Sequence, residues 1–169
     1  VQTCALPISK DKQFLPEKFN HSKMIAKIFF EISKDSFYAP SLQSFEKFCQ
    51  GSFEVSVNGV HYLIMFAIDQ EKIIGFIIVK IIMSDADIEF ICVDKDYRSQ
   101  GIGSSLLKNL ENFFTENNRL EVNRIFLEVS VENKEAICLY EKFFFKTIGL
   151  RKKYYKNGED AFVMEIGRA

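Results

Sequence analysis

The sequence is poor in the residues that build metal centres and disulfide frameworks. Its 169 residues include no tryptophan, two histidines and four cysteines. The histidines are far apart in the chain, so we expect no metal site. The cysteines form no C-x-x-C pair, a pattern typical of reduced thiols in a cytosol. They are Cys4, Cys49, Cys92 and Cys138.

Long apolar runs and a strong net charge are also absent. No stretch approaches the roughly 20 apolar residues that span a bilayer, so we expect a cytoplasmic protein without a membrane partner. The formal net charge is −1, which argues against general nucleic-acid binding. Hydrophobic residues make up 47% of the chain and charged residues 27%, which is typical of a globular protein. The 18 phenylalanines predict a core built largely on that residue.

The first eight residues differ in character from the rest of the chain. Residues 1–8 read as an in-frame translation of a sequencing-adapter oligonucleotide, and we interpret them as a foreign segment that packs against nothing. On this interpretation Cys4 is not a native residue. The remaining residues, 9–169, have the length of one domain and show no repeat or linker.

Helical and strand patterns follow one another along this domain. Apolar spacing predicts a helix over 22–37, which ends before Pro40, and a short helix from Ser41 to before Gly51. Further helices are predicted over 102–117, with Ile102, Leu106, Leu107, Leu110, Phe113 and Phe114 inward, and from Asn133 to about Phe144. The predicted strands are 61–68, 73–83, 88–93, 124–131, 145–155 and 161–166, with turns at 84–87 and 156–158. The run 73–83 is almost wholly apolar, which predicts burial on both of its faces.

A basic turn with two glycines joins the strand 88–93 to the helix 102–117. Its sequence is Arg98-Ser-Gln-Gly101-Ile-Gly103. A helix N-terminus presents unpaired N–H groups and the positive end of a dipole, so it suits a phosphate. Glycines let the backbone approach a ligand closely, and Ser104 and Ser105 could add hydroxyl donors. This is not a Walker loop, and an ordinary strand-to-helix turn is the alternative.

Glu128 is a carboxylate among apolar residues of a predicted central strand. Burial would raise its pKa, which suits a general base. The alternative is a position at a strand end, where Glu128 reaches water or pairs with a lysine.

Tyr140 follows Asn133 by seven residues, which is about two helical turns. Both side chains therefore share one helix face, which could meet a ligand held by the glycine turn. A tyrosine there could donate a proton to a leaving thiolate. The alternative is a core tyrosine with a satisfied hydroxyl group.

From Ile88 to Ile166 the sequence resembles the GNAT acetyltransferase superfamily, and within it the RimI-type N-terminal protein acetyltransferases. The matching stretches are Arg98–Gly103, Leu127–Val129 with Asn133, Ala136–Glu141 and Tyr154–Ala161. The last is the most discriminating, because many GNAT enzymes for small amines lack it. The resemblance implies an α/β (α+β) GNAT fold, whose mixed, mostly antiparallel twisted sheet has about six to seven strands flanked by about four helices.

The resemblance also implies roles for individual residues. Glu128 would be the general base, and Tyr140 the general acid that protonates the sulfur of coenzyme A. Tyr154 and Tyr155 would line a peptide groove, opposite Phe37 and Tyr38. Acetyl-CoA would be held, with no metal required, by Cys92, Val93, Arg98, Gln100, Gly101, Ile102, Gly103, Ser104, Asn133 and Tyr140. Phe144 departs from the family, which usually has glycine before Phe145.

The expected acceptor is a protein or peptide N-terminus, and a ribosomal protein is the family expectation for a bacterium. One alternative is a GNAT enzyme that acetylates a small-molecule amine or a lysine side chain, and Tyr154 with Tyr155 weighs against it. The other is a non-catalytic acyl-CoA-binding module, and the presence of both Glu128 and Tyr140 weighs against that.

Overall fold

The computed structural model describes residues 60–69, 72–116 and 121–167. Three predictions fall outside the described residues. They are the foreign segment at residues 1–8, the two N-terminal helices, and the site residues Phe37 and Tyr38.

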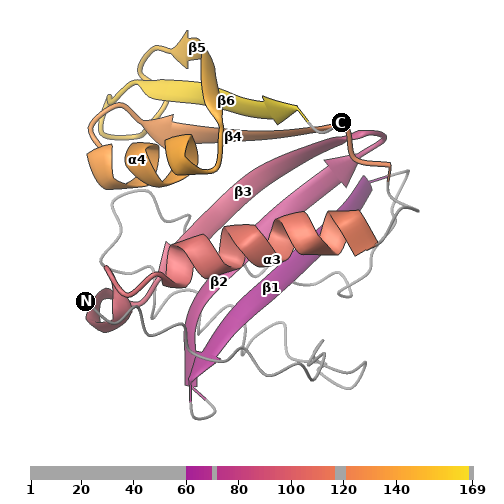
Figure 1. Ribbon diagram of the computed structural model, residues 1–169. Coiled ribbons are helices and arrows are strands. Elements are labelled where there is room, and N and C mark those ends of the chain that lie inside the picture. Colours follow the sequence, from indigo (N-terminus) through magenta and orange to yellow (C-terminus); the bar gives the residue numbers. More distant parts are fainter. Residues whose placement is uncertain (1–59, 70–71, 117–120, 168–169) are drawn as a thin grey trace.

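A six-stranded sheet organises the described residues, in the order β1-β2-β3-β4-β6-β5 (Figure 1). β3 and β4 pair in parallel, and the other neighbouring strands pair antiparallel. The strands are β1 (Val60–Asp69), β2 (Lys72–Ile82), β3 (Asp85–Val93), β4 (Arg124–Ser130), β5 (Lys146–Arg151) and β6 (Ala161–Gly167). The predicted mixed, mostly antiparallel sheet is therefore confirmed.

Two α-helices, α3 (Ile102–Glu116) and α4 (Lys134–Lys142), belong to the described residues, together with a short 3-10 helix, η1 (Lys95–Tyr97). α3 lies across one face of β1, β2 and β3 (Figure 1). Its predicted inner stripe is confirmed, because all of those side chains are buried except Phe113, which is partly buried against the same core. Within the described part of the chain, no helix is long and apolar enough to cross a membrane.

β2 is the most deeply buried strand of the sheet. The stretch from Ile74 to Val79 is buried at every position, on both faces of the strand. This confirms the expectation drawn from its apolar sequence.

Two predicted boundaries are wrong. β3 begins at Asp85 instead of Ile88. The turn before it occupies only Met83 and Ser84, and Asp85 and Asp87 belong to the strand. Arg124 of β4 donates two hydrogen bonds to Asp85, at 2.9 and 2.7 Å, which supports this polar start of the strand. β5 ends at Arg151 instead of Tyr155, and Lys153 turns the chain with a φ of 51°.

β3 and β4 separate soon after they begin to pair. Their parallel register runs from Asp85 opposite Arg124 to Ile88 opposite Leu127, and neither strand ends there. A β-bulge lies at the same level, because Ile78 of β2 pairs with Phe90 while Val79 pairs with Ile88. The extra residue is Glu89, and such a bulge bends a strand. The two strands therefore form a fork, which opens toward the start of α3 and toward α4 (Figure 1).

α4 ends in a left-handed turn made by Phe144. The N–H of Phe144 donates to the carbonyl of Glu141 at 2.9 Å, and the N–H of Phe145 donates to the carbonyl of Tyr140 at 3.1 Å. These two bonds define a Schellman motif, and the Tyr140 and Phe145 rings add its apolar contact at a centroid distance of 5.9 Å. Phe144 has a φ of 64° in this motif, at the position where glycine is favoured.

We expect Phe144→Gly to stabilise the protein. A left-handed φ costs an L-residue about 1–2 kcal/mol, whereas the extra freedom of glycine in the unfolded chain offsets about 0.5–1 kcal/mol of the gain. The Phe144 side chain is 77% exposed, so its removal sacrifices little apolar burial. Urea unfolding should therefore show a gain of up to about 1 kcal/mol for glycine. Phe144→Ala removes the ring but keeps Cβ, and a stability of Phe144→Ala equal to that of Phe144→Gly would contradict the explanation.

Candidate active site

Acidic side chains meet on one face of the sheet at the fork. Leu127 and Val129 of β4 point into the core, so Glu128 between them points to the opposite face, which we call the outer face. Asp87 and Glu89 of β3 point to the same face, because Ala86 and Ile88, which alternate with them, are buried in the core. The outer face of the fork therefore carries three carboxylates, and two cationic side chains, Lys80 and Arg151, pair with two of them.

Glu128 stands where β4 leaves its pairing with β3. Its side chain is 28% exposed, and its carboxylate forms an ion pair with Arg151 of β5 at 3.1 Å. Glu128 is therefore not at a strand end, since it lies within β4 opposite Val163 of β6, just beyond the last residue paired with β3. It does have an ion-pair partner, as the alternative interpretation expects, but the partner is an arginine and not a lysine. A half-exposed ion pair of this kind is weak, so an incoming ammonium group can replace the guanidinium.

Glu89 is a second carboxylate of the outer face. Burial raises its pKa, the Lys80 ammonium at 4.0 Å opposes this rise, and the charges of Asp87 and Glu128 add to it. No sequence pattern marks Glu89 or Arg151 as site residues, since each is an ordinary polar residue of an exposed strand position. Their proximity to Glu128 arises from the pairing of strands that are distant in the sequence.

Tyr154 and Tyr155 lie in the loop between β5 and β6, and their rings pack edge to face at a centroid distance of 5.1 Å. Burial raises the pKa of Tyr154, the charge of Glu128 adds to the rise, and Arg151 opposes it. The Arg151 guanidinium also lies over the Tyr154 ring, 5.5 Å from its centroid. The structure therefore brings Tyr154 to the outer face beside Glu128.

Tyr140 occupies the opposite side of β4, inside the core. It is 5% exposed and belongs to the same apolar cluster as Leu127 and Val129. Burial raises the pKa of Tyr140 well above its ordinary range, and the charges of Tyr155 and Cys92 add to the rise. Tyr140 therefore keeps its proton at every physiological pH.

Cys92, near the end of β3, is a half-buried cysteine that forms no disulfide bond. Burial raises the pKa of Cys92 to about 11, against the opposing effect of the Arg98 charge. A thiol with this pKa is protonated at neutral pH, and the thiolate is the nucleophilic form. Cys92 is thus a poor covalent nucleophile, which favours a direct reaction over one through a cysteine intermediate.

The start of α4 is set by Asn133. Its side-chain oxygen accepts a hydrogen bond from the N–H of Ala136 at 3.1 Å, which is the predicted N-cap. This cap fixes the direction of the helix that carries Tyr140. The structure accordingly assigns Asn133 a structural task in addition to the cofactor contact that the resemblance implies.

The glycine turn leads into α3 at the open end of the fork. Arg98 donates from Nε to the carbonyl of Val93 at 3.2 Å, and Gln100 donates to the carbonyl of Asp96 at 3.1 Å. Both side chains thus brace the turn against the end of β3 and against η1. No acidic side chain lies in the first turn of α3, so an anion meets no carboxylate there.

Glycine is favoured at positions 101 and 103 of the turn for different physical reasons. Gly101 has a φ of 83°, and a Cβ added there would meet nothing within 4 Å, so the space above the turn is open. Gly103 faces α4, where a Cβ would lie 3.0 Å from Leu139. Gly103 is therefore explained by helix packing, and Gly101 by its backbone conformation beside an open space.

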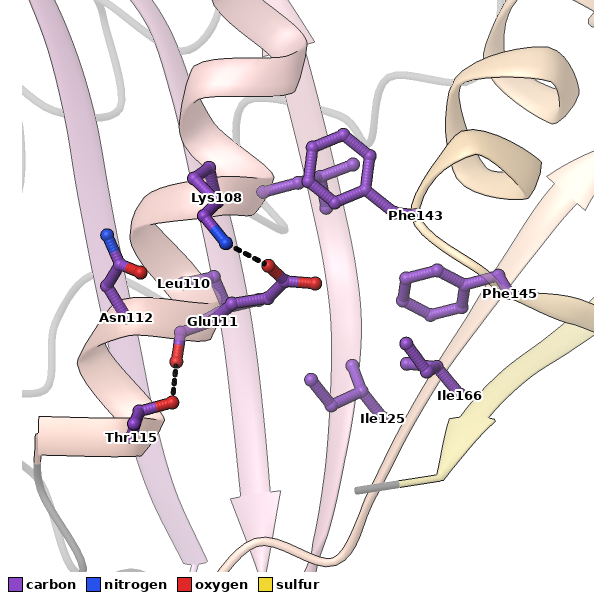
Figure 2. A pocket seen from close by; sticks show the side chains of 10 residues that line it. Lys108, Leu110, Glu111, Asn112, Thr115, Ile125, Phe143, Phe145 and Ile166 are labelled. Carbon is purple, nitrogen blue, oxygen red and sulfur yellow. Dashed lines mark hydrogen bonds and ion pairs between the residues drawn. The ribbon is translucent and has the colours of Figure 1, made fainter. Parts of the chain in front are cut away.

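A hollow of about 250 Å³ lies elsewhere, between the second half of α3 and the β4–β6 part of the sheet (Figure 2). Phe143, Phe145, Ile125 and Ile166 form its apolar side, and the Lys108–Glu111 ion pair lies at its rim. Among the residues that the structure describes, none of the predicted site residues lines this hollow.

The fold and the fork define an acetyltransferase. The family model described as "Acetyltransferase (GNAT) family" matches residues 25–145, and the chain belongs to this family. It is an acetyl-CoA-dependent N-acetyltransferase, as the sequence resemblance implied.

Three relatives illustrate this membership. The ribosomal protein bS18-alanine N-acetyltransferase of Escherichia coli is 33% identical over 114 residues, which cover 66% of this chain and 75% of that protein. The crystal structure of the E. coli ribosomal-protein-S18-alanine N-acetyltransferase superposes with a TM-score of 0.72 at 28% identity, over 85% of this chain and 88% of that one.

The N-alpha-acetyltransferase of Sulfolobus acidocaldarius is 42% identical over 74 residues, or 44% of this chain and 43% of that protein. An acetyltransferase from Bacillus anthracis, solved in complex with acetyl coenzyme A, has a TM-score of 0.55 at 32% identity. It covers 64% of this chain and 63% of that one.

Proposed function

We propose that this enzyme acetylates the N-terminal α-amino group of a protein, and that a ribosomal protein is its acceptor. The observation that carries the proposal is that Arg151 pairs with Glu128 at 3.1 Å and also lies over the Tyr154 ring, so that Glu128 and Tyr154 meet on the carboxylate-bearing outer face of the fork. An α-ammonium group is a cation, so it is attracted to this face. The names of the E. coli and S. acidocaldarius relatives support the same class of acceptor.

The chemistry of the acceptor favours an N-terminus over a lysine. An α-amino group has an ordinary pKa of about 8 and a lysine one of about 10.4, so deprotonation near neutral pH costs about 3 kcal/mol less at the N-terminus. A single carboxylate is then an adequate base. We assign this role to Glu128, which the acceptor ammonium reaches by displacing the Arg151 guanidinium.

We assign the role of general acid, which protonates the leaving thiolate, to Tyr140. When bound, acetyl-CoA supplies an activated thioester carbonyl, which a neutral amine attacks directly. Tyr140 keeps its proton because it is buried, and it lies close to Cys92 at the open edge of β3. Tyr140 can therefore act as the general acid that donates a proton to the departing sulfur of coenzyme A.

The cofactor seat is assigned to the end of β3 and the start of α3. The backbone of Cys92 and Val93 lies along the open arm of the fork, beyond the last residue paired with β4. The open space above Gly101 and the carboxylate-free first turn of α3 fit a pyrophosphate. Arg98, Gln100, Ile102, Gly103 and Ser104 complete this seat.

We expect the enzyme to acetylate short peptides at their α-amino group. The test uses acetyl-CoA with peptides that differ in their first residue, beside the same peptides blocked at the N-terminus but carrying an internal lysine. Mass spectrometry should locate the new acetyl group on the first residue, and the blocked peptides should not react. Turnover of free lysine, polyamines or blocked peptides, without turnover of the unblocked peptides, would contradict the proposal and favour a small-amine or lysine acetyltransferase.

Glu128→Gln and Tyr140→Phe should each lower turnover on the best peptide by about 10²–10⁴-fold, because general acid and base groups contribute that much. Raising the pH should partly restore Glu128→Gln, since more of the amine is then already neutral, and should help Tyr140→Phe less. Calorimetry should show that both variants still bind acetyl-CoA. Glu132→Gln alters an exposed carboxylate just beyond β4 and is the matched control. Wild-type turnover in both site variants would show that these roles are wrong.

Ser104→Glu tests the cofactor seat without disturbing the fold. Ser104 lies in the first turn of α3, where a glutamate favours helix stability but repels a pyrophosphate. We expect acetyl-CoA affinity to fall by about tenfold or more, equivalent to about 1.4 kcal/mol, with no loss of thermal stability. Ser104→Gln has nearly the same size without the charge and should bind more tightly than Ser104→Glu. Equal affinity of the two variants would place the pyrophosphate elsewhere.

A further inference from the structure

Ser130, the last residue of β4, carries a deeply buried polar side chain that is 1% exposed. Its hydroxyl group donates a hydrogen bond to Oε2 of Glu159 and accepts one from the N–H of Glu132 at 3.1 Å. Glu159 follows the predicted 156–158 turn, in which the N–H of Gly158 donates to the carbonyl of Tyr155. A part-buried hydrogen bond between a hydroxyl and a carboxylate therefore joins the end of β4 to the loop over residues 152–160, which we call the acceptor loop.

Backbone hydrogen bonds reinforce the same junction. The N–H of Val131 donates to the carbonyl of Asp160 at 3.1 Å, and the N–H of Tyr155 donates to the carbonyl of Glu159 at 3.1 Å. The N–H of Lys153 donates to the Asp160 side chain at 2.8 Å. Glu159 thus holds the acceptor loop through its backbone and β4 through its side chain.

The location of this contact relates it to the proposed chemistry. Ser130 lies two residues beyond Glu128, on the same face of β4, and its carbonyl accepts a hydrogen bond from the N–H of Asn133, the cap of α4. In the acceptor loop, Tyr154 packs against Tyr155, and the Tyr154 ring lies 5.5 Å from the guanidinium of Arg151, the ion-pair partner of Glu128. The Ser130–Glu159 contact therefore lies where three elements meet: β4, which carries Glu128; α4, which carries Tyr140; and the acceptor loop, which carries Tyr154 and Tyr155.

We propose that Glu159 is a positioning residue, whose carboxylate, held by Ser130, fixes the acceptor loop over the fork before an acceptor binds. The inference deepens the proposed function and rests on it. A hydrogen bond to an ionised group is stronger than one between neutral groups, and it is stronger still where water is excluded. Without this bond, the loop must be ordered when the acceptor binds, and that cost weakens acceptor binding.

The kinetic test compares Ser130→Ala and Glu159→Ala with the full-length wild-type enzyme. Loss of a hydrogen bond to a charged group should raise KM for the best peptide by about tenfold or more, while kcat changes little and KM for acetyl-CoA is unchanged. Glu159→Gln keeps an oxygen that can accept the Ser130 hydrogen bond and should restore most of the peptide affinity. Glu132→Ala removes an exposed carboxylate from the same corner and should behave as wild type.

Hydrogen exchange tests the positioning role without any acceptor. The amides of Lys153 and Tyr155 should exchange faster in Ser130→Ala and Glu159→Ala than in the wild-type protein, and Glu132→Ala should leave them unchanged. Unchanged exchange, or a peptide KM that stays at the wild-type value, would overturn the role of Glu159 even if the wild-type enzyme acetylates peptides. A wild-type enzyme that acetylates no peptide would instead overturn the acceptor itself.

Discussion

The separation of β3 from β4 is the constraint on which the site depends. Parallel strands that stay paired form hydrogen bonds between their backbone N–H and C=O groups, and they leave no room for a ligand between them. Here the pairing ends at Ile88 and Leu127, although both strands continue. β3 keeps its partner β2 along one edge, and no residue of β4 pairs with its other edge beyond Ile88. Polar backbone in an opening of this kind suits a ligand that can pair with it, and the bulge at Glu89 helps to bend β3 away.

The two faces of β4 provide different electrostatic surroundings for Tyr140 and Glu128. Tyr140 lies in the apolar core, where ionisation is disfavoured and the proton is retained. Glu128 is flanked in β4 by the core residues Leu127 and Val129, but its side chain points to the outer face, where it forms an ion pair with the exposed Arg151. Alternation of side-chain direction along β4 thus places Glu128, the proposed base, on the face opposite the core that holds Tyr140, the proposed acid.

The corner between β4 and α4 is held by several local interactions because α4 is short. A helix of nine residues is marginal by itself, so its ends and its packing decide its direction. Asn133 caps one end, and the Schellman turn at Phe144 closes the other at a cost in backbone strain. Ser130 and Glu159 add a contact to the acceptor loop on the other side of the strand. The orientation of Tyr140 follows from these interactions together.

The sequence by itself determined the local elements, since the α3 stripe, the buried β2 strand, the Asn133 cap and the glycine turn each depend on neighbouring residues. It also singled out Glu128 and Tyr140 as candidates, because the motifs around them are contiguous. The tertiary structure alone decided which partners these residues have. Arg151, Glu89 and Ser130 carry no sequence signal, and they meet the site because β3, β4, β5 and β6 pair across long chain separations. Side-chain contacts between such strands depend on register, and register depends on the packing of the whole sheet.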